Sequence, residues 1–188
     1  MINVMKKLMT YDDVHIDGFI CPGHVAAVIG ANPFEELSMI SHTPMSICGF
    51  KMAEILSGIL SIENMINKGE YRCDNLYKTV VSDKGSIGAE KIMEEVFDRC
   101  SNEWRGMGWI EDTGLKFKQE YRKFDALRKF DIVCKQKKSI YGCICGEILR
   151  GAKRPDECRL FAKVCNPAHP VGPCMVSLEG TCRSLYKI

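Results

Sequence analysis

Short apolar runs alternate with longer segments of helical periodicity in the first part of the chain. An apolar run at residues 15–20 ends at a Cys-Pro-Gly-His turn, and a new apolar pattern at 25–29 predicts the start of a helix. Residues 43–49 are a second strand candidate, and residues 52–66 follow as a periodic helix. One face of that helix carries Ile55, Ile59, Ile62 and Ile66. Strands and helices in this alternation predict a parallel sheet.

The pattern continues less regularly into a third unit. Residues 76–81 are predicted to form a strand and residues 87–100 a helix. The inward face of this helix is expected to carry Ile92, Met93, Val96 and Phe97. A turn between Trp104 and Trp109 leads toward another strand. The segment 115–130 mixes aromatic and charged residues, and we expect it to lie as an amphipathic segment on the core.

Composition places the chain among ordinary globular proteins. Of its 188 residues, 46% are hydrophobic and 27% are charged, which suits one or two domains. The 26 basic and 24 acidic residues leave a formal charge of +2, which argues against a nucleic-acid partner. The basic run at 135–138 is interpreted as a solvated linker, and residues 135–139 as the boundary between two parts of the chain.

The beginning of the sequence lacks the features of a secreted or membrane protein. Two lysines near Met1 are not followed by the apolar stretch of a signal peptide, and no window is apolar enough to cross a bilayer. We therefore expect a cytoplasmic protein without membrane contact, whose thiols are normally reduced.

Cysteine is concentrated in one region. Of 11 cysteines, six fall near the C-terminus in the order Cys143-x-Cys145-x12-Cys158-x6-Cys165-x8-Cys174-x7-Cys182. In a reducing compartment this concentration indicates a metal centre or thiol chemistry rather than a disulfide scaffold. Six thiols exceed the four ligands that a zinc ion or an iron–sulfur cluster takes, which leaves two thiols for another task.

The spacing favours an iron–sulfur cluster but leaves zinc and unligated structural cysteines open. Zinc sites usually contain close C-x2–4-C pairs, whereas Cys143 and Cys145 are closer than that range and Cys158 and Cys165 are further apart. Arg154 begins a segment with proline and two acidic residues, which predicts a helix start. A helix continuing through Cys165 would separate its Cα atom from that of Cys158 by about 10.5 Å. A disulfide requires about 7 Å or less, so this pair is expected to favour a cluster.

The sequence also resembles one family, the hydrogenase maturation factor HypD, and specifically its C-terminal half. Matching residues occur along the whole chain and are densest between Gly142 and Cys182. They include Asp17-Gly-Phe-Ile20, Pro22-Gly-His-Val25, Glu103-Trp-Arg-Gly106, Phe124-Asp-Ala126, Gly142-Cys-x-Cys-Gly146, Glu157-Cys158, Pro170-Val-Gly172 and Cys174-Met-Val-Ser177.

The resemblance implies a hydrogenase maturation scaffold with a redox role rather than a conventional enzyme. Such a scaffold binds iron while a transient Fe(CN)2CO centre, with two cyanides and one carbon monoxide, is assembled for nickel-iron hydrogenase. The implied partners are a HypC-like chaperone and a HypE-like cyanide donor. By position, the family's [4Fe-4S] ligands correspond to Cys143, Cys158, Cys165 and Cys182. Its thiol redox pair corresponds to Cys145 and Cys174.

Residues outside the cysteine-rich C-terminal region are assigned roles on less evidence. His24 follows a Pro-Gly turn at the predicted end of a strand, where ligands sit in open α/β sheets, and is a candidate for the iron cleft. A histidine capping a helix is the alternative. Trp104 and Arg105 are expected at a domain junction. The remaining cysteines lack partner spacing and are interpreted as ordinary thiols: Cys21, Cys48, Cys73, Cys100 and Cys134.

Together these features predict an α/β protein of two domains. Residues 1–134 would form a partial Rossmann-like lobe with a parallel sheet, and residues 139–188 a small, mainly helical, cysteine-rich iron–sulfur domain. The family's N-terminal half is missing, so we expect a fragment, one piece of a split protein or a diverged relative. Lys51-Met52, Thr79 and Ser86 also depart from the family pattern. The alternatives are a stand-alone iron–sulfur electron-transfer or thiol-redox module, and a nonfunctional remnant.

Overall fold

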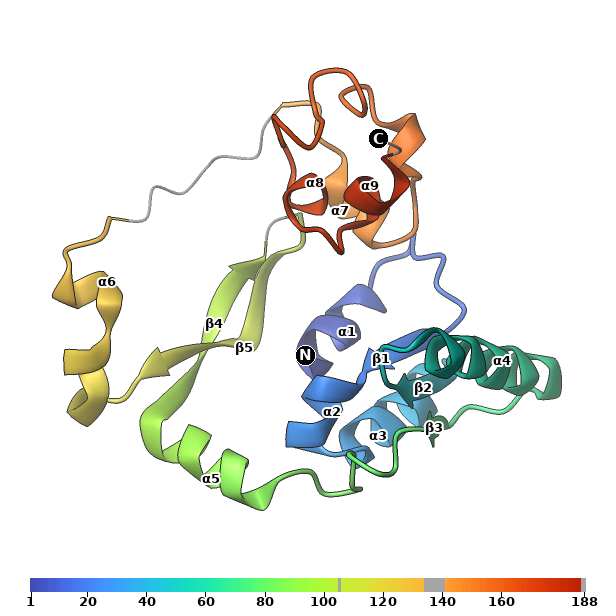
Figure 1. The fold of residues 1–188 in the computed structure, drawn as a ribbon, viewed down its shortest axis with the longest axis horizontal. Helices are drawn as coiled ribbons and strands as arrows, with labels where there is room; N and C mark the ends of the chain where they lie inside the picture. Colours follow the sequence, from blue (N-terminus) through green and yellow to red (C-terminus); the bar gives the residue numbers. More distant parts are fainter. Residues whose placement is uncertain (105, 134–140, 187–188) are drawn as a thin grey trace.

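The computed structural model describes residues 1–104, 106–133 and 141–186 (Figure 1). Its N-terminal lobe is built on a parallel sheet with the strand order β1-β2-β3, which confirms the predicted parallel sheet. The strands are β1 (Phe19–Pro22), β2 (Met45–Cys48) and β3 (Cys73–Asn75). The helices of this lobe are α1 (Ile2–Leu8), α2 (Gly23–Ile29), α3 (Asn32–Ser41) and α4 (Met52–Lys68).

The central strand β2 is buried on both faces, as expected for a parallel sheet between helices. Met45 and Ile47 belong to the apolar core, together with residues of α2 and α3 such as Phe34. Ser46 and Cys48 lie against Gly58 of α4 on the other face. The sheet of the lobe is therefore covered on both sides, by α2 and α3 on one face and by α4 on the other.

The predicted helix at 52–66 is present as α4, with well-formed ends. The carboxylate of Glu54 accepts a hydrogen bond from the Lys51 backbone N–H at 2.9 Å. The helix ends at Gly69, whose φ of 65° is the left-handed conformation that glycine adopts at little cost. Gly58 and Met65 are the buried residues of α4, whereas Ile59, on the predicted apolar face, is 48% exposed.

The predicted strand at 76–81 is a loop. The Asn75 side chain accepts a hydrogen bond from Tyr77 N–H at 3.0 Å and donates one to the Val81 carbonyl at 2.8 Å. An asparagine that satisfies backbone groups in this way favours a turn over a continuing strand. The strand is therefore the preceding segment, β3.

The middle of the chain forms an arm whose hairpin packs against α1, where Val4 meets Met107 and Ile110 in a small buried cluster. It consists of α5 (Ile87–Val96), the antiparallel strands β4 (Phe97–Trp104) and β5 (Gly108–Phe117), the 3-10 helix η1 (Gln119–Phe124) and α6 (Ala126–Lys129) (Figure 1). The predicted helix at 87–100 thus stops at Val96, and the predicted strand after the Trp104 turn is present.

Two burial predictions for this arm are wrong. Ile92 of α5 is 63% exposed, and α5, η1 and α6 contain no buried residue. The segment predicted to lie on the core instead exposes Phe124 and Phe130. The apolar periodicity was real, but among the described residues nothing packs over these faces closely enough to bury them.

The C-terminal part forms a separate group of short helices: α7 (Cys145–Leu149), η2 (Pro155–Glu157), α8 (Pro173–Val176) and α9 (Thr181–Leu185). Its apolar cluster shares no residue with the core of the lobe. None of the helices in the described part of the chain has the length and hydropathy needed to cross a membrane. The predicted boundary at 135–139, Arg105 and Cys134 lie outside the described residues.

The predicted helix from Arg154 through Cys165 is also wrong. The helix-start signals at Arg154 do form a helix N-terminus, since Glu157 accepts a hydrogen bond from the Arg154 N–H at 2.7 Å. The helix that follows is only the single turn η2. Cys158 is already extended, with ψ of 122°, and Cys165 N–H bonds back to the Leu160 carbonyl at 2.8 Å. Cys158 and Cys165 are therefore related by turns, and the separation expected along a helix does not apply.

Candidate metal and thiol site

All six C-terminal cysteines line one cavity. Cys145 lies in α7, Cys174 in α8 and Cys182 in α9, the three helices that gather at the C-terminal end of the molecule in Figure 1. Cys143 lies just before α7, and Cys158 and Cys165 lie in the segment between α7 and α8. The cavity is lined by Cys143, Cys145, Ile148, Cys158, Leu160, Phe161, Cys165, Gly172, Cys174, Met175 and Cys182. The structure thus brings together residues that are up to 39 positions apart in the sequence, from Cys143 to Cys182.

Glycines allow these turns to pack closely. A Cβ atom at Gly172 would lie 2.7 Å from the Sγ atom of Cys143 and 3.6 Å from that of Cys145. A Cβ atom at Gly180 would lie 2.2 Å from the carbonyl oxygen of Cys174. Only glycine fits at these two positions without a shift of the sulfur-bearing segments.

Cys145 and Cys174 form a close pair in the cavity. Their Sγ atoms are 2.8 Å apart, within hydrogen-bond distance, and both residues are buried. The hydrogen bond shared by the two thiols, followed by burial, raises the pKa of the Cys174 thiol above its ordinary value. Two thiols this close can form a disulfide of about 2.05 Å with a small movement of their side chains.

The other four cysteines surround this pair. The Sγ atom of Cys165 accepts a hydrogen bond from the Val171 N–H at 3.3 Å, and the Cys158 thiol lies 4.0 Å from the Gly142 carbonyl oxygen. Burial is the main cause that raises the pKa of Cys143, and the same cause, with the neighbouring thiolates, raises the pKa of Cys182 to about 11. The thiolate form of Cys143 and of Cys182 is therefore disfavoured in this apolar space.

The six thiols of the cavity suit a positively charged metal centre that takes several sulfur ligands. Among the described residues that line the cavity, none carries a positive charge that could offset several thiolates. A metal centre supplies such charge, and thiolates are the ligands of iron–sulfur clusters. Within the described chain, no three His, Cys, Asp or Glu side chains are placed to hold a single metal ion.

A clamp ties the cavity to the N-terminal lobe. At the end of α7, the Arg150 guanidinium binds both carboxylate oxygens of Asp13, at 3.0 and 2.8 Å, and lies 4.6 Å from the centre of the Tyr11 ring. The hydrogen bond to Arg150 lowers the pKa of Asp13. At the start of α7, the backbone of Gly146 lies against Gly106 in the β4–β5 turn. Helix α7 is thereby held at both ends.

Sequence reasoning missed this clamp. Arg150, Gly106 and Gly146 stood in the matching motifs without an assigned role, and nothing in the sequence singles out Asp13. Trp104 is on the hairpin whose turn meets α7, and its indole N–H donates to Thr113 at 2.9 Å.

His24 lies apart from the sulfur cavity. It is exposed near the start of α2, at the C-terminal end of β1, and its ring centre is 5.4 Å from that of Phe50.

The lobe contains another contact that the sequence analysis did not predict. A hydrogen bond with Cys73, together with burial, raises the pKa of the Cys21 thiol. Strands two apart in the sheet bring these cysteines together, which spacing in the sequence could not predict.

Comparison with known proteins assigns the chain to a family. The family model HypD, described as "Hydrogenase formation hypA family", matches residues 1–188. A hydrogenase expression/formation protein of Methanocaldococcus jannaschii is 41% identical over 184 residues, which are 98% of this chain and 51% of that protein. The hydrogenase maturation factor HypD of Cupriavidus necator is 39% identical over 96% of this chain and 48% of its own length. HypD of Escherichia coli strain K12 is 34% identical, with 100% and 50% covered. The chain spans about half the length of these relatives.

Proposed function

Since the chain belongs to the HypD family of hydrogenase maturation factors, we propose that it is the C-terminal half of a maturation scaffold, with a [4Fe-4S] site and a redox-active thiol pair. The observation that carries the proposal is the convergence of six cysteines on one apolar cavity, with two of them in hydrogen-bond contact. The names of the relatives favour hydrogenase maturation over a stand-alone electron-transfer module.

The cluster ligands in this proposal are Cys143, Cys158, Cys165 and Cys182. They line the same cavity as the close pair, and their thiolates have no neutralising side chain among the residues described there. When bound, a [4Fe-4S] cluster supplies single electrons at a potential set by its ligands and surroundings. The apolar residues around the cavity, such as Leu160 and Met175, limit the access of water to that site.

Cys145 and Cys174 are the redox pair. Exchange with a disulfide on a partner oxidises the two thiols to one S–S bond and reduces the partner to a dithiol, and the reverse exchange restores both. The 2.8 Å contact means that the pair needs little rearrangement for either direction. The clamp at Arg150 and Asp13 holds α7, and with it Cys145, in position against the lobe.

Membership of the family is also the basis for the iron centre and the partner proteins that we propose. The iron of the Fe(CN)2CO centre would be bound transiently in the cytoplasm, with the exposed His24 as a candidate residue of the iron cleft at the C-terminal end of β1. A HypC-like chaperone and a HypE-like cyanide donor are the proposed partners. A second polypeptide, equivalent to the N-terminal half of the family, would complete the scaffold.

Two substitutions separate the proposed roles. In anaerobically purified protein, Cys158→Ala removes a cluster ligand and should abolish the brown chromophore and most of the iron. Cys145→Ala should keep the colour and the iron, and lose one of the two thiols that form the pair. Absorbance, iron content and thiol titration measure these outcomes. Equal loss of iron in both variants would contradict the division into four ligands and two redox thiols.

A further inference from the structure

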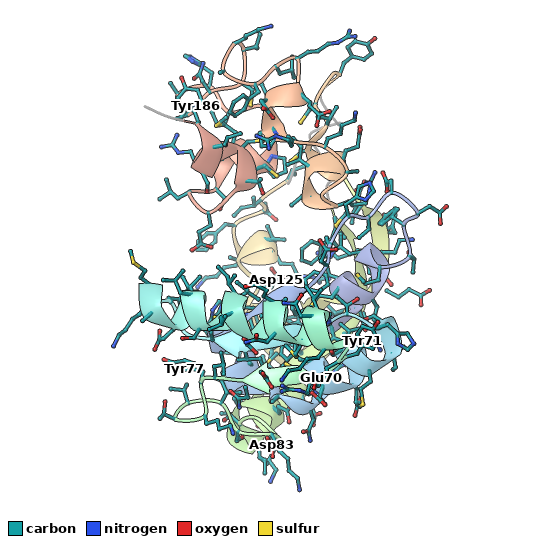
Figure 2. The ribbon with its side chains drawn as sticks, turned by 90° about the vertical axis from the view of Figure 1, so that its right-hand side faces the viewer. Glu70, Tyr71, Tyr77, Asp83, Asp125 and Tyr186 are labelled. Carbon is teal, nitrogen blue, oxygen red and sulfur yellow. The ribbon has the colours of Figure 1, made fainter. Side chains whose placement is uncertain are left out.

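The six cysteines of the cavity differ in how far solvent reaches them. Four of them are at most 7% exposed, whereas Cys143 and Cys158 are partly exposed. Phe161 of the cavity wall is covered by Tyr186, which is labelled in Figure 2, with the two ring centres 6.2 Å apart. A centre held by these thiols would therefore lie nearest to solvent at Cys143 and Cys158.

A groove lies outside this part of the cavity. Its lining includes Gly142, Ile144, Glu157 and Leu160. Leu160 also lines the cavity, so its side chain lies between the groove and the sulfur atoms. The Sγ atom of Cys158 lies 4.0 Å from the Gly142 carbonyl oxygen, which places this sulfur beside the groove. A molecule in the groove would thus come close to any centre that Cys158 helps to hold.

The charges around the groove leave a positive side chain unpaired. Lys153 and Glu157 neutralise each other, since their charged atoms are 3.2 Å apart. Arg159 also lines the groove, is exposed, and forms no ion pair with another described residue. Glu147 in the lining is less exposed than Arg159, and Lys163, four positions after Arg159, is exposed as well. The solvent side of the groove therefore favours a negatively charged partner.

We propose that this groove is the docking surface for a one-electron carrier with an acidic contact face. One electron passes from the reduced carrier to the centre held by the cysteines, so the carrier is oxidised and the centre reduced by one electron, and no bond forms or breaks. Electron transfer slows steeply with distance, and the groove lies beside the partly exposed thiols Cys143 and Cys158. Contacts between electron carriers are small and short-lived, so one groove with an unpaired Arg159 is enough to guide them. The inference rests on the cluster of the proposed function.

The first test needs no cluster. The full chain without metal is alkylated by neutral iodoacetamide and anionic iodoacetate in competition, and each cysteine is followed by mass spectrometry of its peptide. Cys143 and Cys158 should react at least about tenfold faster than Cys165 and Cys182. In Arg159→Glu, the ratio of the iodoacetate rate to the iodoacetamide rate at Cys158 should fall at least about threefold, because the new charge repels the anion. The ratio does not depend on how much thiolate is present.

The second test uses the chain with its cluster and a reduced plant-type [2Fe–2S] ferredoxin as the acidic carrier. Ferredoxin should reduce Arg159→Glu at least about fivefold more slowly than the unmodified chain. Lys78→Glu is the control, because it reverses an exposed positive charge in the loop after β3 of the lobe, and its rate should be unchanged. Reduced methyl viologen, a small cation, should be slowed by neither substitution.

Equal ferredoxin rates for the two variants would overturn the inference, as would no reduction by ferredoxin of a chain that methyl viologen reduces. Alkylation of all six cysteines at one rate, in a chain that circular dichroism shows to be folded, would overturn it too. Iron and sulfide content measured before mixing separates the two possible failures. A chain without iron would contradict the proposed cluster, whereas a loaded chain whose variants behave alike would contradict only the groove.

Discussion

At the scale of single residues, the C-terminal site depends on close packing around sulfur. The raised pKa of Cys143, Cys174 and Cys182 reflects burial and neighbouring thiols, so the cavity disfavours charge unless a cationic centre is bound. Sequence spacing could single out all six cysteines because their concentration is unusual. It could not predict that Gly172 must be small, since this requirement comes from contacts with Cys143 and Cys145 across the cavity.

Gly172→Ala tests this packing. The added methyl group would meet the Cys143 sulfur at 2.7 Å, which should destabilise the fold by about 1–3 kcal/mol and lower iron incorporation. Gly88→Ala is the control, because nothing lies within 4 Å of a Cβ atom there and alanine favours the helix α5. Thermal melting and iron content of both variants provide the comparison. Identical behaviour of the two variants would mean that the Gly172 contact has no role.

At the scale of elements, α7 connects the sulfur cavity to the rest of the molecule. Asp13 and Arg150 are 137 positions apart, and their pair joins the segment after α1 to the end of α7. The pKa of Asp13 is lowered, so the carboxylate contributes stability above its unfolded value of 3.8 and loses that contribution as the pH falls through its lower folded value.

Asp13→Asn should therefore lower the melting temperature slightly at pH 7, because the pair is partly exposed, and the difference from the unmodified chain should shrink below pH 3.8. Asp156→Asn is the matched control, since Asp156 pairs with Arg154 only two positions away and joins no separate segments. A difference that is independent of pH, or one equally large for Asp156→Asn, would argue against the clamp.

The elements also show where sequence patterns succeed and fail. The helical period predicted α4 because its apolar pattern is long and regular, and the short apolar run at residues 43–49 predicted β2. The helix signals at Arg154 produced one turn, since Cys158 is held extended in a wall of the cavity. The Asn75 turn replaced a predicted strand. The first failure depends on the cavity that Cys158 lines, and the second on hydrogen bonds that Asn75 makes within the next six residues.

At the scale of the whole molecule, the described chain contains compact and open parts. The lobe and the cysteine-rich part each have an apolar cluster, whereas α5 and α6 bury no residue. Amides in α5 and α6 should therefore exchange at least about 100-fold faster than those of β2 when the chain is alone. Hydrogen exchange measured by mass spectrometry tests this difference. Uniform protection across the three elements would contradict the burial pattern.

The central claim is that four of the converging cysteines hold one iron–sulfur cluster. Its most direct test is the iron and acid-labile sulfide content of the unmodified chain after anaerobic purification. A [4Fe-4S] cluster predicts about four iron and four sulfide per chain with a brown colour. A colourless protein that contains one zinc ion and no sulfide would contradict the claim.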